Sequence, residues 1–218
     1  MTDEEKIRKT EKYLRETLSA GAYLRAHPSA LDYRIEHSYR VAQIGKTIAE
    51  KEGMDPTAMA VGCLLHDIAY CEDFRNEEDW LNHGRRSAAI ARPFVETLGF
   101  DEKTKEDILF GIAIHVDDQS DFDGEYTVFA KTIGEADNID RFGAYRIFEN
   151  LAACGFLEMK TSERKAYLTN SIAKLEEYRT IEFSTETGGK MWDEVTGFYL
   201  EYLKRLEHQL RQSELLTI

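Results

Sequence analysis

Residues 31–52, LDYRIEHSYRVAQIGKTIAEKE, show the spacing on which the fold class depends. Apolar or aromatic side chains and one histidine recur there in steps of four, four, three and four residues: Tyr33, His37, Val41, Ile44 and Ile48. Side chains at this spacing share one face of an α-helix. The stretch therefore predicts an amphipathic helix that stops at Gly53, with His37 on the same side as the apolar residues.

The same periodicity predicts further helices on both sides of this stretch. They cover about residues 3–20, 56–70, 83–99, 102–116, 129–147, 162–178 and 191–211. We expect Pro93 to kink or restart one of them, and Gly188 and Gly189 to lie in a polar link. Alternating runs of β-branched residues are scarce, and the chain has only three prolines. The predicted fold class is therefore all-α.

The composition favours one soluble domain. The chain has 218 residues, and 28 basic against 41 acidic residues give a net charge of −13. This length suits one domain over residues 1–218, with its core at about 31–150 and C-terminal helices over 160–215. The negative charge disfavours binding to a nucleic-acid polymer or to an anionic membrane. The N-terminus lacks the pattern of a secretory signal and no apolar run is long enough to span a bilayer, so we expect a cytoplasmic location.

Several predicted helices turn an imidazole or a carboxylate towards their apolar side. These residues are His37, His66 with the adjacent Asp67, His115 and Asp137. One inward histidine is more often a hydrogen-bonded core residue than a metal ligand, but each further one weakens that explanation. A buried carboxylate is costly unless it is paired or metal-bound, and imidazoles with carboxylates suit Mn, Fe, Co, Ni or Zn. The pattern favours a shared divalent transition metal.

The segment Leu64-Leu65-His66-Asp67-Ile68 resembles the signature of the HD-domain metal-dependent phosphohydrolase superfamily. More specific is the order of His37, then His66-Asp67, then Asp137, which matches the H…HD…D pattern of that superfamily. The resemblance spans about residues 33–211 and is closest to the small single-domain bacterial HD hydrolases. It implies a helical bundle of the HD type with flanking N- and C-terminal helices.

The resemblance also implies a ligand set for one or two metal ions. A first ion would be held by His37, His66, Asp67 and Asp137. The positions of His83 and His115 match those that hold a second ion in binuclear members of the superfamily, where the HD aspartate, here Asp67, bridges the two ions.

Phosphate groups bound by an acidic chain need cations nearby, and Arg40 lies one turn after His37. The other candidates for substrate binding flank the predicted ligands: Arg85, Arg86, Lys131 and Arg141. Besides Asp67, we expect Glu72 and Asp73 to be catalytic, because they are the nearest acids after the HD pair and could orient water or protonate a leaving group.

The predicted function is hydrolysis of a phosphoester or phosphoanhydride bond in a small phosphorylated compound, with a nucleotide as the favoured class. A divalent ion with open coordination positions lowers the pKa of bound water and polarises a phosphoryl oxygen, so no protein nucleophile is needed. Two alternatives stay open. One is a mixed-valent di-iron oxygenase of the same superfamily, and the other is a non-catalytic module that binds a nucleotide as a sensor. The sequence also leaves the oligomeric state open, a homo-oligomer included.

Overall fold

The computed structural model describes residues 1–213, which form helices and connecting turns with no strand among them. The predicted all-α class is confirmed. The described residues form two compact units, residues 1–140 and 141–213. The sequence predicts a single domain over residues 1–218, with its core at 31–150 and C-terminal helices over 160–215. That domain organisation stays a prediction. Residues 214–218 lie outside the described part of the chain.

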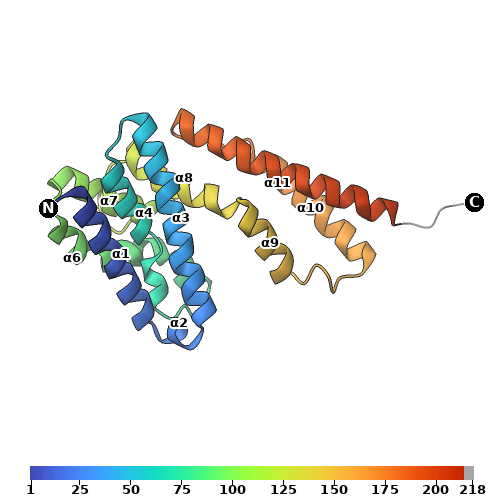
Figure 1. Ribbon diagram of the computed structural model, residues 1–218, viewed down its shortest axis with the longest axis horizontal. Helices are drawn as coiled ribbons and strands as arrows, with labels where there is room; N and C mark the ends of the chain where they lie inside the picture. The colour runs from blue at the N-terminus through green and yellow to red at the C-terminus, as the bar shows by residue number, and fades with distance from the viewer. Residues whose placement is uncertain (214–218) are drawn as a thin grey trace, which may run out of the picture. The chain divides into compact units, whose positions relative to one another are not determined.

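The N-terminal unit contains α1 to α8 (Figure 1). Their bounds are α1 Asp3–Ala20, α2 Ala22–Ala26, α3 Pro28–Glu52, α4 Pro56–Leu65, α5 Glu77–Leu81, α6 His83–Val95, α7 Glu102–Ile114 and α8 Val128–Arg141. Polar side chains fix several of the starts. Thr2 and Glu5 form a capping box before α1, and Asp55 accepts hydrogen bonds from two backbone N–H groups at the start of α4.

Helix α4 lies at the centre of this unit, where it packs against α1, α3, α6 and α7. All of residues 57–65 are buried, so the helix is apolar on every side. Glycines let its neighbours approach closely. A Cβ atom on Gly45 of α3 would lie 2.5 Å from the sulfur of Cys63, and one on Gly62 would lie 2.5 Å from the Cδ1 atom of Ile133 in α8. This packing places the end of α4 deep inside the unit.

Several helix ends differ from those that the periodicity predicts. Helix α4 ends at Leu65 and a 3-10 turn follows over Ile68–Cys71, because His66 bonds back to a carbonyl at the end of the helix. Helix α6 runs through Pro93 to Val95 and gives way to a 3-10 turn only after it. The acidic loop around residues 72–80 contains α5, which begins after the capping residue Asn76.

The C-terminal unit contains α9 Ala144–Ala153, α10 Thr161–Tyr178 and α11 Glu186–Gln212. The helix expected over residues 129–147 is interrupted at Phe142 and Gly143, where the backbone of Gly143 is extended. The glycines expected in a polar link lie in the first turn of α11, because Thr185 caps that helix through the N–H of Gly188. Helices α10 and α11 pack against each other around Leu168 and Leu203.

No helix within residues 1–213 combines the length and the hydropathy that crossing a membrane requires.

Candidate metal centre

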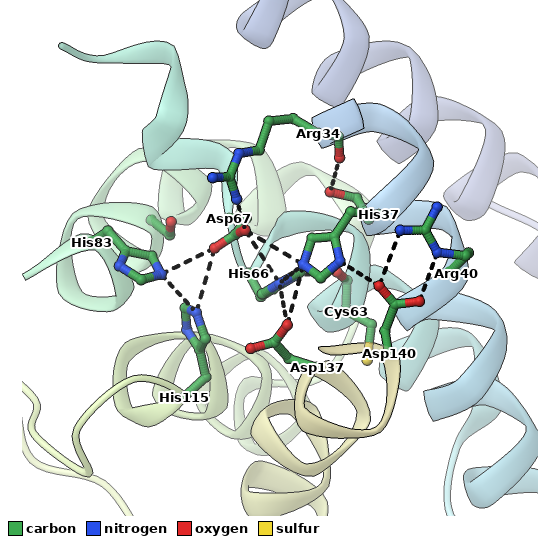
Figure 2. A network of polar contacts seen from close by, with 12 residues as sticks. Arg34, His37, Arg40, Cys63, His66, Asp67, His83, His115, Asp137 and Asp140 are labelled. Carbon is green, nitrogen blue, oxygen red and sulfur yellow. Dashed lines mark hydrogen bonds and ion pairs between the residues drawn. The ribbon is translucent and has the colours of Figure 1, made fainter. Parts of the chain in front are cut away.

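Five segments of the N-terminal unit bring four histidines and three aspartates together (Figure 2). Helix α3 carries His37, and His66 and Asp67 follow the end of α4. His83 begins α6 and His115 caps the end of α7. Helix α8 carries Asp137 and, one turn later, Asp140. All six predicted metal ligands thus lie in one cluster. Asp140 contacts one of them, His37, at its Nδ1 atom.

Each histidine of the cluster has its Nδ1 atom bonded to an oxygen. The Nδ1 atoms of His66, His83 and His115 lie 2.7, 2.5 and 2.7 Å from the carbonyl oxygens of the residues three positions earlier. That of His37 lies 2.7 Å from the Oδ2 atom of Asp140. A carbonyl or carboxylate oxygen only accepts hydrogen bonds, so each Nδ1 carries the proton. In its neutral form each of these imidazoles then presents the lone pair of its Nε2 atom to the centre of the cluster.

The first group of ligand atoms comes from His37, His66, Asp67 and Asp137. The Nε2 atom of His37 lies 3.2 Å from that of His66 and 3.2 Å from the Oδ1 atom of Asp137. The Oδ2 atom of Asp67 lies 3.6 and 3.7 Å from the Nε2 atoms of His37 and His66. Two lone pairs facing each other at 3.2 Å repel, so a proton or a metal ion must lie between them.

The second group uses the other oxygen of Asp67. Its Oδ1 atom lies 3.1 Å from the Nε2 atom of His83 and 3.6 Å from that of His115. These two Nε2 atoms are 3.2 Å apart. Asp67 therefore turns one oxygen to each pair of histidines, which is the arrangement that a carboxylate bridging two ions requires.

The separations fit divalent ions. Bonds of about 2.1 Å hold neighbouring ligand atoms about 3.0–3.4 Å apart in tetrahedral or octahedral geometry, close to the distances of both groups. Three sets of ligand atoms, each within 4.8 Å of one another, come from His37, His66 and Asp67, from His66, His115 and Asp137, and from Asp67, His83 and His115. Imidazole nitrogens with carboxylate oxygens favour a transition metal over calcium or magnesium.

The electrostatics of the cluster keep its carboxylates ionised. Burial opposes ionisation of Asp67, but in the metal-free cluster the neighbouring imidazoles of His66, His115 and His83 outweigh it and hold the pKa of Asp67 well below its usual value. Burial likewise opposes ionisation of Asp137, whose pKa is held well below its usual value by His37 and His66. Both aspartates are thus ready to act as ligands.

The protein also shapes the protonation of His37. Burial disfavours its charged form, but hydrogen bonds to Asp137 and Asp140 outweigh burial and raise the pKa of His37 to about 9. In the metal-free protein at neutral pH a proton is therefore held where an ion would bind.

Two residues that support the cluster escaped the sequence-based prediction of the site. Asp140 accepts hydrogen bonds from the Nδ1 atom of His37 and from the Nε and Nη2 atoms of Arg40. Arg34 donates from Nη1 to the Oδ2 atom of Asp67 at 2.9 Å. The available signal was helical spacing, because Arg34 lies one turn before His37 and Asp140 one turn after Asp137.

Three of the five cations predicted to bind substrate face carboxylates. Arg40 holds Asp140, Arg85 lies 3.1 Å from Asp117, and Arg86 lies 2.5 Å from Glu72. Lys131 is exposed, and Arg141 is exposed at the start of the C-terminal unit. Substrate binding by these five residues stays a prediction.

The two acids predicted to be catalytic lie outside the His/Asp cluster. Glu72 and Asp73 follow the 3-10 turn and line a cavity with Tyr33, Arg34 and Tyr70. Their catalytic role, too, stays a prediction.

Comparison with known proteins agrees with the fold. Residues 34–141 match the family model of the HD domain. This part of the chain therefore belongs to the HD domain family, as the order of His37, His66-Asp67 and Asp137 predicts. No curated protein matches the chain.

Solved structures share the fold along nearly the whole chain. An HD-superfamily hydrolase from Bacillus thuringiensis is 18% identical with a TM-score of 0.67, over 98% of this chain and 100% of that one. YpgQ from Bacillus subtilis, solved in complex with ADP, is 19% identical with a TM-score of 0.63, over 96% and 97% of the two chains. A predicted HD-superfamily hydrolase from an uncultured Thermotogales bacterium is 22% identical with a TM-score of 0.59, over 93% and 91%. At these identities the likeness shows the fold.

Proposed function

We propose that the protein is a metal-dependent phosphohydrolase that cleaves a phosphoester or phosphoanhydride bond of a small phosphorylated compound, with a nucleotide as the favoured class of substrate. The observation that carries the proposal is the cluster itself, in which four fixed Nε2 atoms and two ionised carboxylates face one another. The ADP bound to YpgQ, a structure of the same fold, supports a nucleotide.

In this proposal His37, His66, Asp67 and Asp137 would hold one ion, and Asp67, His83 and His115 would hold a second. Such ions supply an activated water and polarise a phosphoryl oxygen. The chain's own part is positioning. The carbonyls of Cys63, Trp80 and Ile112 and the carboxylate of Asp140 keep the imidazole protons away from the centre. The buried surroundings limit the access of other water to the site.

The test is phosphate release from a panel of nucleotides and simple phosphoesters by protein loaded with Mn²⁺, Co²⁺ or Ni²⁺. Activity is expected with at least one ion, and Asp67→Ala is expected to abolish it because both groups of ligands lose their shared member. Asp107→Ala is the matched control, since Asp107 is an aspartate of α7 that contacts Lys103 and Thr127 outside the cluster. Inactivity with every ion and every substrate would contradict the proposal.

The second candidate is a di-iron oxygenase. It is favoured by the position of Asp67, which turns one carboxylate oxygen to each pair of histidines. Iron-loaded protein would then consume O₂ and show the spin coupling of a mixed-valence pair, whereas a single ion per chain in elemental analysis would remove this candidate.

A further inference from the structure

A cavity of 410 Å³ in the N-terminal unit has several aromatic residues in its lining. Four of its nine lining residues are aromatic: Tyr23, Tyr33, Tyr70 and Phe74. Its volume falls within the range of roughly 300–1,000 Å³ that is typical of small-molecule sites.

Three contacts connect the wall of this cavity with the metal centre. Arg34, which lines the cavity, donates to the Oδ2 atom of Asp67 at 2.9 Å. The ring of Tyr70 lies 5.3 Å from that of His83, and the ring of Tyr33 stacks on His37 at 5.9 Å between centroids. The side chains of Tyr33, Arg34 and Tyr70 therefore border the cavity and also contact the metal ligands (Figure 2 shows Arg34 above Asp67).

The chemistry of the wall suits a flat ring and not a further phosphate. Among the described residues that line the cavity, Arg34 is the one cation, and its guanidinium lies 3.3 Å over the ring of Tyr70 while it bonds Asp67. The other charged residues of the wall are Glu72 and Asp73, which would repel a phosphate. Aromatic rings, by contrast, stack on the flat face of any nucleotide base. This stacking does not depend on which hydrogen-bond donors and acceptors the edge of the base carries.

The two carboxylates restrict which edge of a ring can face them. An ionised carboxylate accepts hydrogen bonds and donates none. Arg86 donates from Nε and Nη2 to the two oxygens of Glu72, which fixes the direction of that carboxylate. A ring edge that carries an amino group matches this wall, whereas an edge that carries a carbonyl oxygen does not.

We propose that this aromatic cavity holds the base of a nucleotide whose phosphate lies at the metal centre, and that Glu72 and Asp73 select a base with an exocyclic amino group. The inference rests on the proposed function and extends it to the class of substrate. Phe74 stacks on the base, and Arg34 is a positioning residue because it contacts both the ring of Tyr70 and Asp67.

The experiment measures binding by isothermal titration calorimetry with Mn²⁺-loaded protein and three probes: AMP, ribose 5-phosphate and IMP. The wild-type protein is expected to bind AMP at least about tenfold more tightly than ribose 5-phosphate, which lacks the base. It is expected to bind AMP at least about fivefold more tightly than IMP, which carries an oxygen in place of the amino group.

Two variants and one control assign these differences to the cavity. Phe74→Ala is expected to lower the ratio of AMP to ribose 5-phosphate affinity at least about fivefold, and Glu72→Gln to bring AMP and IMP to within about twofold of each other. Phe198→Ala, at a phenylalanine of α11 that is 55% exposed, is the matched control and leaves both ratios at their wild-type values.

Equal affinity of the wild-type protein for AMP and ribose 5-phosphate would overturn the inference. So would an equal loss of both affinities in Phe74→Ala, since that residue would then support the fold alone. These are binding measurements, so they differ from the test of the proposed function. Tight binding of AMP without hydrolysis of any substrate would contradict the phosphohydrolase and leave the base site standing.

Discussion

Replacing Asp140 by asparagine removes one negative charge from behind His37 and leaves the shape of the side chain almost unchanged. The carboxylate is buried and accepts three hydrogen bonds, at 2.7 Å from the Nδ1 atom of His37 and at 2.7 and 3.1 Å from Arg40. An amide has a single acceptor oxygen, so it cannot accept all three hydrogen bonds. Either its NH₂ group opposes the guanidinium of Arg40, or it opposes Nδ1 and drives the imidazole proton to the Nε2 atom, where the metal would bind.

We expect Asp140→Asn to weaken metal binding by about 10- to 100-fold, which is the usual effect of losing the partner that orients a histidine ligand. This corresponds to about 1.4–2.8 kcal/mol. The assay is a titration of metal-free protein with Mn²⁺ or Zn²⁺ in competition with a chelator of known affinity, and circular dichroism verifies that the variant is folded.

Asp107→Asn is the control for this titration, because it makes the same chemical change at an aspartate outside the cluster. Its metal affinity is expected to equal that of the wild-type protein. The reasoning is refuted if Asp140→Asn binds metal within about twofold of wild type, or if Asp107→Asn loses as much affinity as Asp140→Asn.

Three further predictions concern the same centre. Chelation is expected to lower the melting temperature, since an ion at about 100 times its dissociation constant adds about 2.7 kcal/mol to stability; a scan that is identical with and without Mn²⁺ would contradict this. Because the pKa of His37 is raised to about 9 in the metal-free protein, the proton must leave on binding, so metal affinity is expected to rise between pH 7 and 9. Calorimetry in two buffers of different ionisation enthalpy counts that proton, and equal heats in the two buffers would refute its release. Gly84→Ala would place a Cβ atom 2.6 Å from the carbonyl oxygen of Ala113 and 3.1 Å from the Nδ1 atom of His115, so it is expected to separate α6 from α7 and to lower the number of bound ions by elemental analysis.

Much of the fold was accessible from the sequence because helical periodicity depends on local spacing. Helix α3 and its inward His37 follow from steps of three and four residues, and Asp55 and Thr2 mark helix starts by their capping chemistry. The ends of α4 and α7 were not accessible in the same way. His66 and His115 continue the periodic pattern, but each ends its helix by donating from Nδ1 to a carbonyl three residues earlier.

The partners of the ligands were harder to predict than the ligands themselves. The roles of Asp140 and Arg34 depend on contacts across 103 and 33 residues of sequence, to His37 and Asp67. Periodicity indicates which face of a helix such a residue occupies but not which helix faces it. The same limit applies to Arg85, an expected substrate ligand that lies against Asp117.

The charges of the cluster explain how so acidic a chain could bind a phosphate. Three buried carboxylates and two guanidinium groups contact one another or the histidines there: Asp67, Asp137, Asp140, Arg34 and Arg40. With neutral imidazoles they leave one net negative charge, which a proton on His37 cancels in the metal-free protein. Two divalent ions in place of that proton would make the cluster strongly positive. Because the cluster is buried, solvent would screen this positive charge only weakly. The counter-charge for a phosphate would then come from the ions, and the arginines would serve to hold the carboxylates that bind them.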